Sequence, residues 1–174
     1  MGHSAELRAK ARNIELLLMD CDGVLTDGRL YFGADGEVLK VFHARDGEGL
    51  TQWRSAGLLA GIISGRNSPA VDLRARQLGI RFVRQGQADK ETALDEILNE
   101  SGCTREQTAY IGDDTPDLGV FKLVGLAVAV GDAHKSVKDA AHFVTGANGG
   151  QGAVREVIDL ILASKAEARA LSDQ

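Results

Sequence analysis

Leu-Leu-Leu-Met-Asp-Cys-Asp-Gly, at residues 16–23, is the stretch of this chain that decides its fold class. The first four residues are continuously apolar, which is typical of a strand buried on both faces of a parallel sheet. Two carboxylates, Asp20 and Asp22, follow directly. They either form an ordinary turn, a common use of Asp and Gly, or begin a site, because ligands bind at the carboxyl ends of such strands.

Five further short apolar runs follow, at residues 58–63, 80–83, 109–111, 126–130 and 142–144. Between them lie segments whose apolar residues recur at helical spacing, such as Leu94, Ile97 and Leu98. This alternation predicts an α/β fold with a doubly wound, Rossmann-like parallel sheet of about six strands. We expect a single domain over residues 1–174, with a frayed, flexible tail from 165 to 174.

Residues 29–43 break this alternation. Two extended runs, 30–32 and 38–42, flank Asp35-Gly36, and Asp-Gly between apolar runs is a strong signal for a β-hairpin. An isolated two-stranded hairpin is only marginally stable in water. The segment is therefore predicted to pack on the body of the domain or on another subunit.

The composition excludes several classes of protein. The net charge of the 174 residues is −5 and the pI is about 5.4, which argues against partners such as nucleic acid or an anionic membrane. The longest apolar run, 124–130, is far too short to span a membrane. Two cysteines without a CxxC pattern, and a polar N-terminus unlike a signal peptide, indicate the cytoplasm.

Polar groups also follow three other predicted strands. Ser64 ends one apolar run, and Lys90 opens a helix, where the helix dipole disfavours a cation. Asp113, Asp114 and Asp117 follow a third run and would repel one another without a cation between them. Singly, each group fits an ordinary turn or a solvated side chain. Together they converge on one sheet edge, where carboxylates can hold Mg²⁺ while a hydroxyl and an ammonium hold a phosphoryl group.

Four motifs in this order resemble those of the haloacid dehalogenase superfamily of phosphotransferases: Asp20-x-Asp22-Gly-Val-x-Thr26, Ser64, Lys90 and Gly112-Asp113-Asp114-x-x-Asp117. A narrower resemblance, over about residues 14–162, is to the members that hydrolyse 3-deoxy-D-manno-octulosonate 8-phosphate in lipopolysaccharide biosynthesis. It adds Arg45-Asp-Gly47, Ser64-Gly-Arg66 and the glycine-rich segment 149–156. The resemblance implies a magnesium-dependent phosphoric monoester hydrolase that forms an aspartyl-phosphate.

The resemblance also implies a role for each matching carboxylate. Asp20 is the nucleophile and a metal ligand. Asp22 is the general acid and then the general base, and its backbone carbonyl binds the metal. Asp113 is the second carboxylate ligand, which Asp114 and Asp117 support.

The same resemblance implies that Ser64 and Lys90 hold the phosphoryl oxygens of the substrate. Residues implied to bind the substrate are Asp22, His43, Ala44, Arg45, Asp46, Gly47, Arg66, Arg74 and Lys90. Thr51 departs from the resemblance, since many members carry a basic residue at that position.

Superfamily members often carry a cap domain after the first motif or between the second and third. Here Asp20 and Ser64 are 44 positions apart and Ser64 and Lys90 are 26 apart, which leaves no room for a cap. Because the reaction needs water excluded, we expect a neighbouring subunit to supply the lid, with the 29–43 hairpin as the interface. The resemblance implies a homotetramer.

Two alternatives stay open. One is a phosphatase of nine-carbon, sialic-acid-type sugar acid 9-phosphates; Arg66 favours the eight-carbon acid, because a guanidinium can hold the substrate carboxylate with two hydrogen bonds. The other, from a different class, is a signalling receiver domain, which also phosphorylates an aspartate. In a receiver the lysine comes last, whereas Lys90 precedes Asp113. A non-catalytic homologue would not need the complete set of residues.

Overall fold

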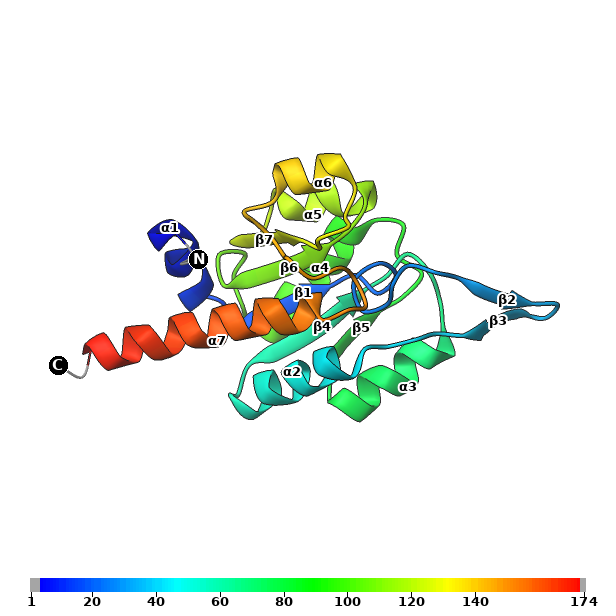
Figure 1. Cartoon of the computed structure of the whole chain (residues 1–174), viewed down its shortest axis with the longest axis horizontal. Helices are drawn as coiled ribbons and strands as arrows, with labels where there is room; N and C mark the ends of the chain where they lie inside the picture. Colours follow the sequence, from blue (N-terminus) through cyan, green and yellow to red (C-terminus); the bar gives the residue numbers. More distant parts are fainter. Residues whose placement is uncertain (1–3, 173–174) are drawn as a thin grey trace.

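The computed structural model describes residues 4–172 and has a six-stranded sheet in the order β5-β4-β1-β6-β7-β8 (Figure 1). All five strand pairings are parallel. The strands are β1 (Leu16–Met19), β4 (Leu59–Ile63), β5 (Phe82–Arg84), β6 (Thr108–Gly112), β7 (Leu126–Ala129) and β8 (Phe143–Val144). The predicted doubly wound α/β sheet is confirmed, with each strand close to its predicted position.

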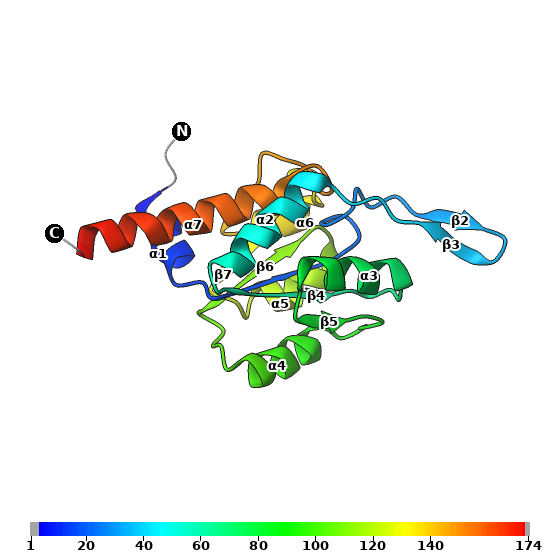
Figure 2. The same cartoon turned by 90° about the horizontal axis from the view of Figure 1, so that it is seen from below.

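Helices cover both faces of the sheet (Figure 2). One face carries α1 (Ala5–Arg12), α2 (Ala44–Ser55), α3 (Pro69–Leu78) and α7 (Ala153–Ser172). The other carries α4 (Lys90–Ser101), α5 (Leu118–Phe121) and α6 (Lys135–Ala140), with a short 3₁₀ turn, η1 (Thr115–Asp117), before α5. None of the described helices is long and apolar enough to cross a membrane.

Strand β1 lies at the centre of the sheet and is fully buried, as its unbroken apolar sequence predicts. The chain first adds β4 and β5 on one side of β1, and then β6, β7 and β8 on the other. The direction of winding therefore reverses beside β1. In doubly wound sheets the ligand crevice lies at the carboxyl ends of the strands at this switch point.

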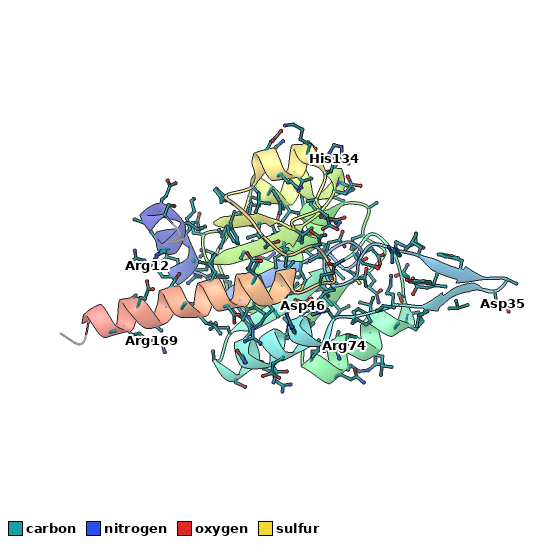
Figure 3. All side chains as sticks on the ribbon, in the orientation of Figure 1. Arg12, Asp35, Asp46, Arg74, His134 and Arg169 are labelled. Carbon is teal, nitrogen blue, oxygen red and sulfur yellow. The ribbon has the colours of Figure 1, made fainter. Side chains whose placement is uncertain are left out.

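The hairpin consists of β2 (Tyr31–Gly33) and β3 (Gly36–Leu39), paired antiparallel, and projects away from the body of the molecule (Figures 1 and 2). Its tip, near Asp35, is far from the helices (Figure 3). The apolar side chains of Leu30, Phe32, Val38, Leu39 and Val41 are 46–67% exposed. The predicted hairpin is therefore confirmed, and within residues 4–172 these apolar side chains are only partly covered.

Residues 165–172 differ from the predicted frayed tail, because they continue α7 as a regular helix. Lys165 Nζ donates to the carbonyl of Arg12 at 3.1 Å and to Glu15 Oε1 at 2.6 Å. Glu167 accepts a hydrogen bond from Arg8 in α1 at 2.8 Å. These contacts hold the last turns of α7 against the N-terminal helix. Residues 173 and 174 of the predicted tail lie outside the described residues.

Candidate active site

The loop after β1 places the first two aspartates at the carboxyl edge of the sheet. The backbone N–H of Asp20 donates to the Ile111 carbonyl at 3.0 Å, which extends the pairing of β1 with β6 by one residue. Thr26 closes the loop, since its N–H donates to the Cys21 carbonyl and its hydroxyl accepts from the N–H of Gly28. The loop thereby returns to β1, and Asp22 faces the same cleft as Asp20.

A cleft of about 390 Å³ lies at this edge. It is lined by Asp20, Asp22, Gly28, Leu30, Ser64, Gly65, Arg66, Gln87, Ala88, Lys90, Asp113, Asp114 and Pro116. Residues from all four sequence motifs thus meet in one cleft. This convergence follows from the parallel sheet, which brings the carboxyl ends of its strands to one edge.

Lys90 is buried at the start of α4 and is surrounded by acceptors. Its Nζ lies 2.7 Å from Asp20 Oδ2, 2.7 Å from Asp117 Oδ1 and 3.4 Å from the Tyr110 hydroxyl. Burial lowers the pKa of Lys90, but the two carboxylates outweigh it, so that its pKa is raised overall. They supply the negative charge that a cation needs at the N-terminus of a helix.

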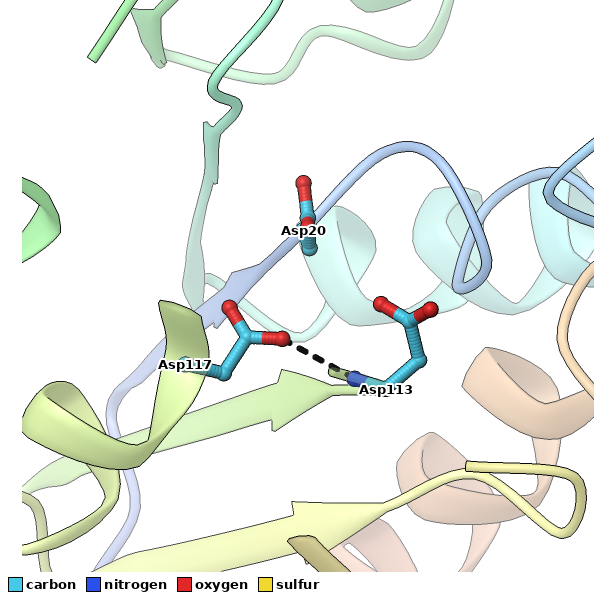
Figure 4. Close-up of side chains that lie close together, drawn as sticks. All are labelled: Asp20, Asp113 and Asp117. Carbon is cyan, nitrogen blue, oxygen red and sulfur yellow. Dashed lines mark hydrogen bonds between the residues drawn. The ribbon is translucent and has the colours of Figure 1, made fainter. Parts of the chain in front are cut away.

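Three carboxylates, those of Asp20, Asp113 and Asp117, have oxygen atoms within 4.8 Å of one another (Figure 4). Burial raises the pKa of Asp20 to about 6, against the attraction of Lys90, and Asp117 adds to the rise. Burial together with repulsion from Asp20 and Asp117 raises the pKa of Asp113 to about 8. Further positive charge beside Asp20 and Asp113 would therefore favour their ionised forms.

Asp117 is the carboxylate whose oxygens are already occupied. Oδ1 accepts from Lys90 Nζ and from the Tyr110 hydroxyl at 2.8 Å. Oδ2 accepts from the N–H group of Asp113 at 2.9 Å (Figure 4). It also accepts from the N–H group of Asp114 at 3.3 Å. By contrast, no hydrogen bond reaches the Asp113 carboxylate from residues 4–172.

A hard divalent cation fits beside Asp20 and Asp113, because carboxylate oxygens are the ligands that Mg²⁺ prefers. Asp117 fits a supporting position that orients the loop. Gly23 keeps this space open, since a Cβ atom there would lie 2.0 Å from Asp113 Oδ2. Asp114 is exposed and instead caps η1, accepting from the N–H of Thr115 at 2.7 Å.

Ser64 and Arg66 form the wall of the cleft beside β4. The buried Ser64 follows β4, and its N–H donates to the Arg84 carbonyl at 2.8 Å. The Arg66 guanidinium lies 5.4 Å from the centre of the Phe32 ring, and its Nε is 3.7 Å from Asp22 Oδ2. Arg66 thus reaches the cleft while it stacks on the hairpin.

Comparisons with known proteins agree with this geometry. Residues 76–158 match the family model for haloacid dehalogenase-like hydrolases. The chain is 49% identical to the 3-deoxy-D-manno-octulosonate 8-phosphate phosphatase of Yersinia pestis over 88% of this chain and 82% of that one. A crystal structure of the Yersinia pestis phosphatase matches with a TM-score of 0.92 and 45% identity, over 95% of this chain and 89% of the other.

A third similar protein is the phosphatase of the same name from Moraxella catarrhalis, whose crystal structure is a complex with magnesium ion, phosphate ion and KDO molecule. It has a TM-score of 0.91 and 38% identity, and the match covers 99% of this chain and all (100%) of that one. The chain belongs to the 3-deoxy-D-manno-octulosonate 8-phosphate phosphatase family. The predicted membership and the predicted class of enzyme, a phosphoric monoester hydrolase, are confirmed.

Lys40 is a residue of this phosphatase that the sequence analysis missed. It is buried at the base of the hairpin, where its Nζ donates to Asp22 Oδ1 and lies 3.1 Å from Glu37 Oε2. Burial lowers its pKa, but the hydrogen bonds that Lys40 donates to both carboxylates outweigh this and raise it overall. The available signal was a single lysine within the apolar run Val-Leu-Lys-Val-Phe at residues 38–42.

Six residues that the resemblance assigned to the substrate do not line this cleft of the phosphatase: His43, Ala44, Arg45, Asp46, Gly47 and Arg74. Asp46 is buried beside the first turn of α7 (Figure 3). Its carboxylate accepts from the N–H groups of Arg155 at 2.8 Å and Gly152 at 3.2 Å. His43 Nδ1 lies 3.9 Å from the same carboxylate. Asp46 therefore caps α7 within one chain.

Arg74 and Gly47 pack against each other between α3 and α2. A Cβ atom on Gly47 would lie 2.3 Å from Arg74 Nη2, and the Arg74 guanidinium lies 5.8 Å from the centre of the Phe42 ring. Ala44 is the first residue of α2, and Arg45 lines a separate groove along α7. Within one chain the structure does not bring these residues to the phosphate end of the cleft.

Proposed function

We propose that the chain is a magnesium-dependent phosphatase that converts 3-deoxy-D-manno-octulosonate 8-phosphate to the free sugar acid and phosphate in lipopolysaccharide biosynthesis. The observation that carries this proposal is the meeting of Asp20, Asp22, Ser64, Lys90 and Asp113 in one cleft. The chain's 49% identity to a phosphatase named for this substrate supports the assignment. The magnesium, phosphate and KDO in the Moraxella catarrhalis complex support both the metal and the product.

In the first half of the reaction, a carboxylate oxygen of Asp20 attacks the phosphorus and the bond from phosphorus to the sugar oxygen breaks. Asp22 gives its proton to the departing sugar oxygen. Ser64 and Lys90 hold the phosphoryl oxygens. Lys90, 2.7 Å from Asp20, also favours the ionised form that must attack.

In the second half, Asp22 takes a proton from a water molecule whose oxygen attacks the aspartyl-phosphate. The bond from phosphorus to Asp20 breaks, phosphate leaves, and Asp22 is protonated again for the next cycle. Mg²⁺ held by Asp20, Asp113 and the backbone carbonyl of Asp22 supplies the positive charge that lets these anionic groups share one site. Asp114 and Asp117 support the metal ligands from the same loop.

Arg66 supports the eight-carbon acid as the substrate. The substrate is anionic at both ends, and Ser64, Lys90 and the metal account only for its phosphate. The Arg66 guanidinium lines the same cleft and can form two hydrogen bonds to a carboxylate. The nine-carbon acid phosphates are the alternative within this class. Membership of a phosphatase family counts against the receiver domain.

The test is phosphate release from a panel of substrates with Mg²⁺: the eight-carbon acid 8-phosphate, a nine-carbon acid 9-phosphate and p-nitrophenyl phosphate. Arg66→Ala is expected to lower kcat/KM for the eight-carbon substrate about 10- to 100-fold, as the loss of a charged hydrogen-bonded pair implies. For p-nitrophenyl phosphate, which has no carboxylate, we expect a change of less than about threefold.

A matched control is Arg81→Ala, because Arg81 also stacks on a phenylalanine, at 5.2 Å from the Phe82 ring, but lies outside the cleft. It should leave both activities unchanged. Equal losses on both substrates with Arg66→Ala, or a native preference for the nine-carbon acid, would contradict the assignment of the substrate.

We further infer that the enzyme is a homo-oligomer, with a tetramer as the state that the resemblance implies. Within residues 4–172, the connection from β1 to β4 holds only the hairpin and α2, and the connection from β4 to α4 holds only α3 and β5. Neither has room for a cap. The exposed apolar side chains of the hairpin favour burial against another subunit, which would also cover the cleft.

The same proposal places the enzyme in the cytoplasm. Cys21 and Cys103 are free thiols, which suits a reducing compartment. Burial and the neighbouring Asp22 raise the pKa of the Cys21 thiol well above its ordinary value, so it is a packing residue and not a nucleophile.

A further inference from the structure

The base of the hairpin reverses the usual placement of polar and apolar side chains. Val38, Leu39 and Val41 are 67%, 52% and 50% exposed, whereas Lys40 between them is only 9% exposed. Lysine is almost never buried unless it is paired. A buried lysine within an exposed apolar segment therefore points to a specific partner.

The partners of Lys40 form a continuous chain of polar contacts. Lys40 Nζ donates to Asp22 Oδ1 and lies 3.1 Å from Glu37 Oε2. The other carboxylate oxygen of Glu37 accepts from the hydroxyl of Ser68, the residue directly before α3. The contacts thus run from the start of α3, through the hairpin, to the carboxylate of Asp22. Asp22 lines the cleft, whereas Lys40 is outside the set of residues that line it.

The hydrogen bond from Lys40 fixes the orientation of the Asp22 carboxylate. Among residues 4–172, Lys40 is its one hydrogen-bond donor, and its other oxygen, Oδ2, is buried without a hydrogen-bond partner. The nearest further cation is Arg66, whose Nε is 3.7 Å from Oδ2. A buried oxygen without a partner costs free energy, and such atoms in native structures call for an explanation, a catalytic role among them.

We propose that Lys40 is a positioning residue for the general acid and base: fixed by Glu37, it holds Oδ1 of Asp22 and leaves Oδ2 as the oxygen that carries the proton. This rests on the proposed function. Lys40 transfers no proton itself. The proton moves from Asp22 Oδ2 to the sugar oxygen, and in the second half from water back to Oδ2. Without Lys40 the carboxylate can rotate, and a misplacement of about 1 Å at a reacting group can cost about 100-fold in rate.

The test compares leaving groups in the full-length chain with Mg²⁺. A sugar alkoxide needs a proton as it departs, whereas p-nitrophenolate is stable as an anion and needs little help from an acid. We expect Lys40→Met to lower kcat/KM about 10- to 100-fold for the eight-carbon acid 8-phosphate but less than about threefold for p-nitrophenyl phosphate. For the sugar substrate the loss should lie in kcat, with KM nearly unchanged. Lys40→Arg should restore part of the loss, because its guanidinium can also donate to both carboxylates.

Lys165→Met is the matched control, because Lys165 also bonds to a carboxylate, that of Glu15, on α7 away from the cleft. It should lower the melting temperature without changing the ratio of the two activities. A Lys40→Met protein that folds and loses both activities equally, or loses neither, would overturn the proposal.

Glu37→Gln keeps the inference testable if Lys40→Met does not fold, since Lys40 then stays in place but loses its charged anchor. It should shift the ratio in the same direction by a smaller factor, and an unchanged ratio would overturn the proposal. If the wild-type chain releases no phosphate from any sugar acid phosphate, the proposed function fails instead. The same ratio can then be measured on whichever alkyl phosphate the chain accepts.

Discussion

The carboxyl edge of the sheet and the hairpin differ in how they depart from ordinary burial. At the sheet edge, charged side chains such as Lys90 and Asp117 are buried, but each has partners within the chain. In the hairpin, apolar side chains such as Val38 and Leu39 are more than half exposed within residues 4–172. Within residues 4–172, the carboxylates at the sheet edge need a further cation to balance their charge. The apolar side chains of the hairpin instead need another protein surface to cover them. The proposed catalytic groups thus meet within one fold, whereas we propose that another subunit covers the hairpin and supplies the lid.

The largest expected effect lies at the sheet edge. Asp20→Asn removes the proposed nucleophile, so we expect turnover of the eight-carbon acid 8-phosphate to fall by about 10⁴-fold or more. The fold should remain, because burial of the ionised Asp20 is unfavourable, as its raised pKa of about 6 indicates. Phosphate release and the circular dichroism spectrum measure the two outcomes.

Asp139→Asn is a control for this loss of charge, because Asp139 is an exposed carboxylate that pairs with Lys135 on α6. It should keep full activity. Turnover near the wild-type level in Asp20→Asn would remove the assignment of Asp20 as the nucleophile.

The hairpin should give the next largest effect. Val38→Asp places a charge on its most exposed apolar position. If this face is buried between subunits, the oligomer should dissociate, and activity at nanomolar concentration should fall about 10-fold, since burial of a charge without a partner is costly. Sedimentation velocity gives the oligomeric state.

The same substitution at Val144 in β8, which is 39% exposed, provides the comparison. Val144→Asp should leave both the oligomeric state and the activity unchanged. A wild-type chain that is strictly monomeric and fully active would show that the hairpin has a different use.

The two regions also differ in how far the sequence predicts them. Asp20 and Asp113 directly follow buried strands, and Asp22 lies two residues after Asp20, so the apolar runs alone place them at one sheet edge. Lys40 and Asp46 could not be placed this way, because their partners depend on how the hairpin and α7 return to the body of the domain. Lys40 meets a residue 18 positions away, and Asp46 meets residues more than 100 positions away. A local pattern, such as the lysine within the apolar run 38–42, can single out the residue but does not identify its distant partner.

A smaller effect concerns how Mg²⁺ bound to the carboxylates at the sheet edge changes the stability of the fold. Without metal, the pKa values of Asp20 and Asp113 are raised to about 6 and about 8. The folded chain therefore binds protons more tightly than the unfolded chain. The stability from these two groups is fully present below about pH 4 and is lost as the pH rises through 6 and 8. Mg²⁺ binds both groups in their ionised form.

The gain in melting temperature on adding Mg²⁺ should therefore grow between pH 5 and pH 8. At 100 times its Kd a ligand adds about 2.7 kcal/mol, or about 5–10 °C for a domain of this size. Asp113→Asn should remove most of the gain at pH 8. A gain of the same size at both pH values, measured by thermal unfolding, would contradict this account of the site.

The smallest effect decides between two roles for Asp46. The resemblance assigns it to the sugar acid, whereas in the structure its carboxylate caps α7 through the N–H groups of Gly152 and Arg155. As a cap, Asp46→Ala should cost about 1 kcal/mol, which lowers the melting temperature by about 2–4 °C. KM for the eight-carbon acid 8-phosphate should change less than about twofold.

Ser4→Ala is the control, because it removes the cap of α1 instead, where Ser4 Oγ accepts from the N–H of Leu7 at 3.2 Å. It should give a similar fall in stability. A tenfold rise in KM at an unchanged melting temperature would show that Asp46 contacts the sugar acid, and that the contact is made in a subunit arrangement other than the single chain.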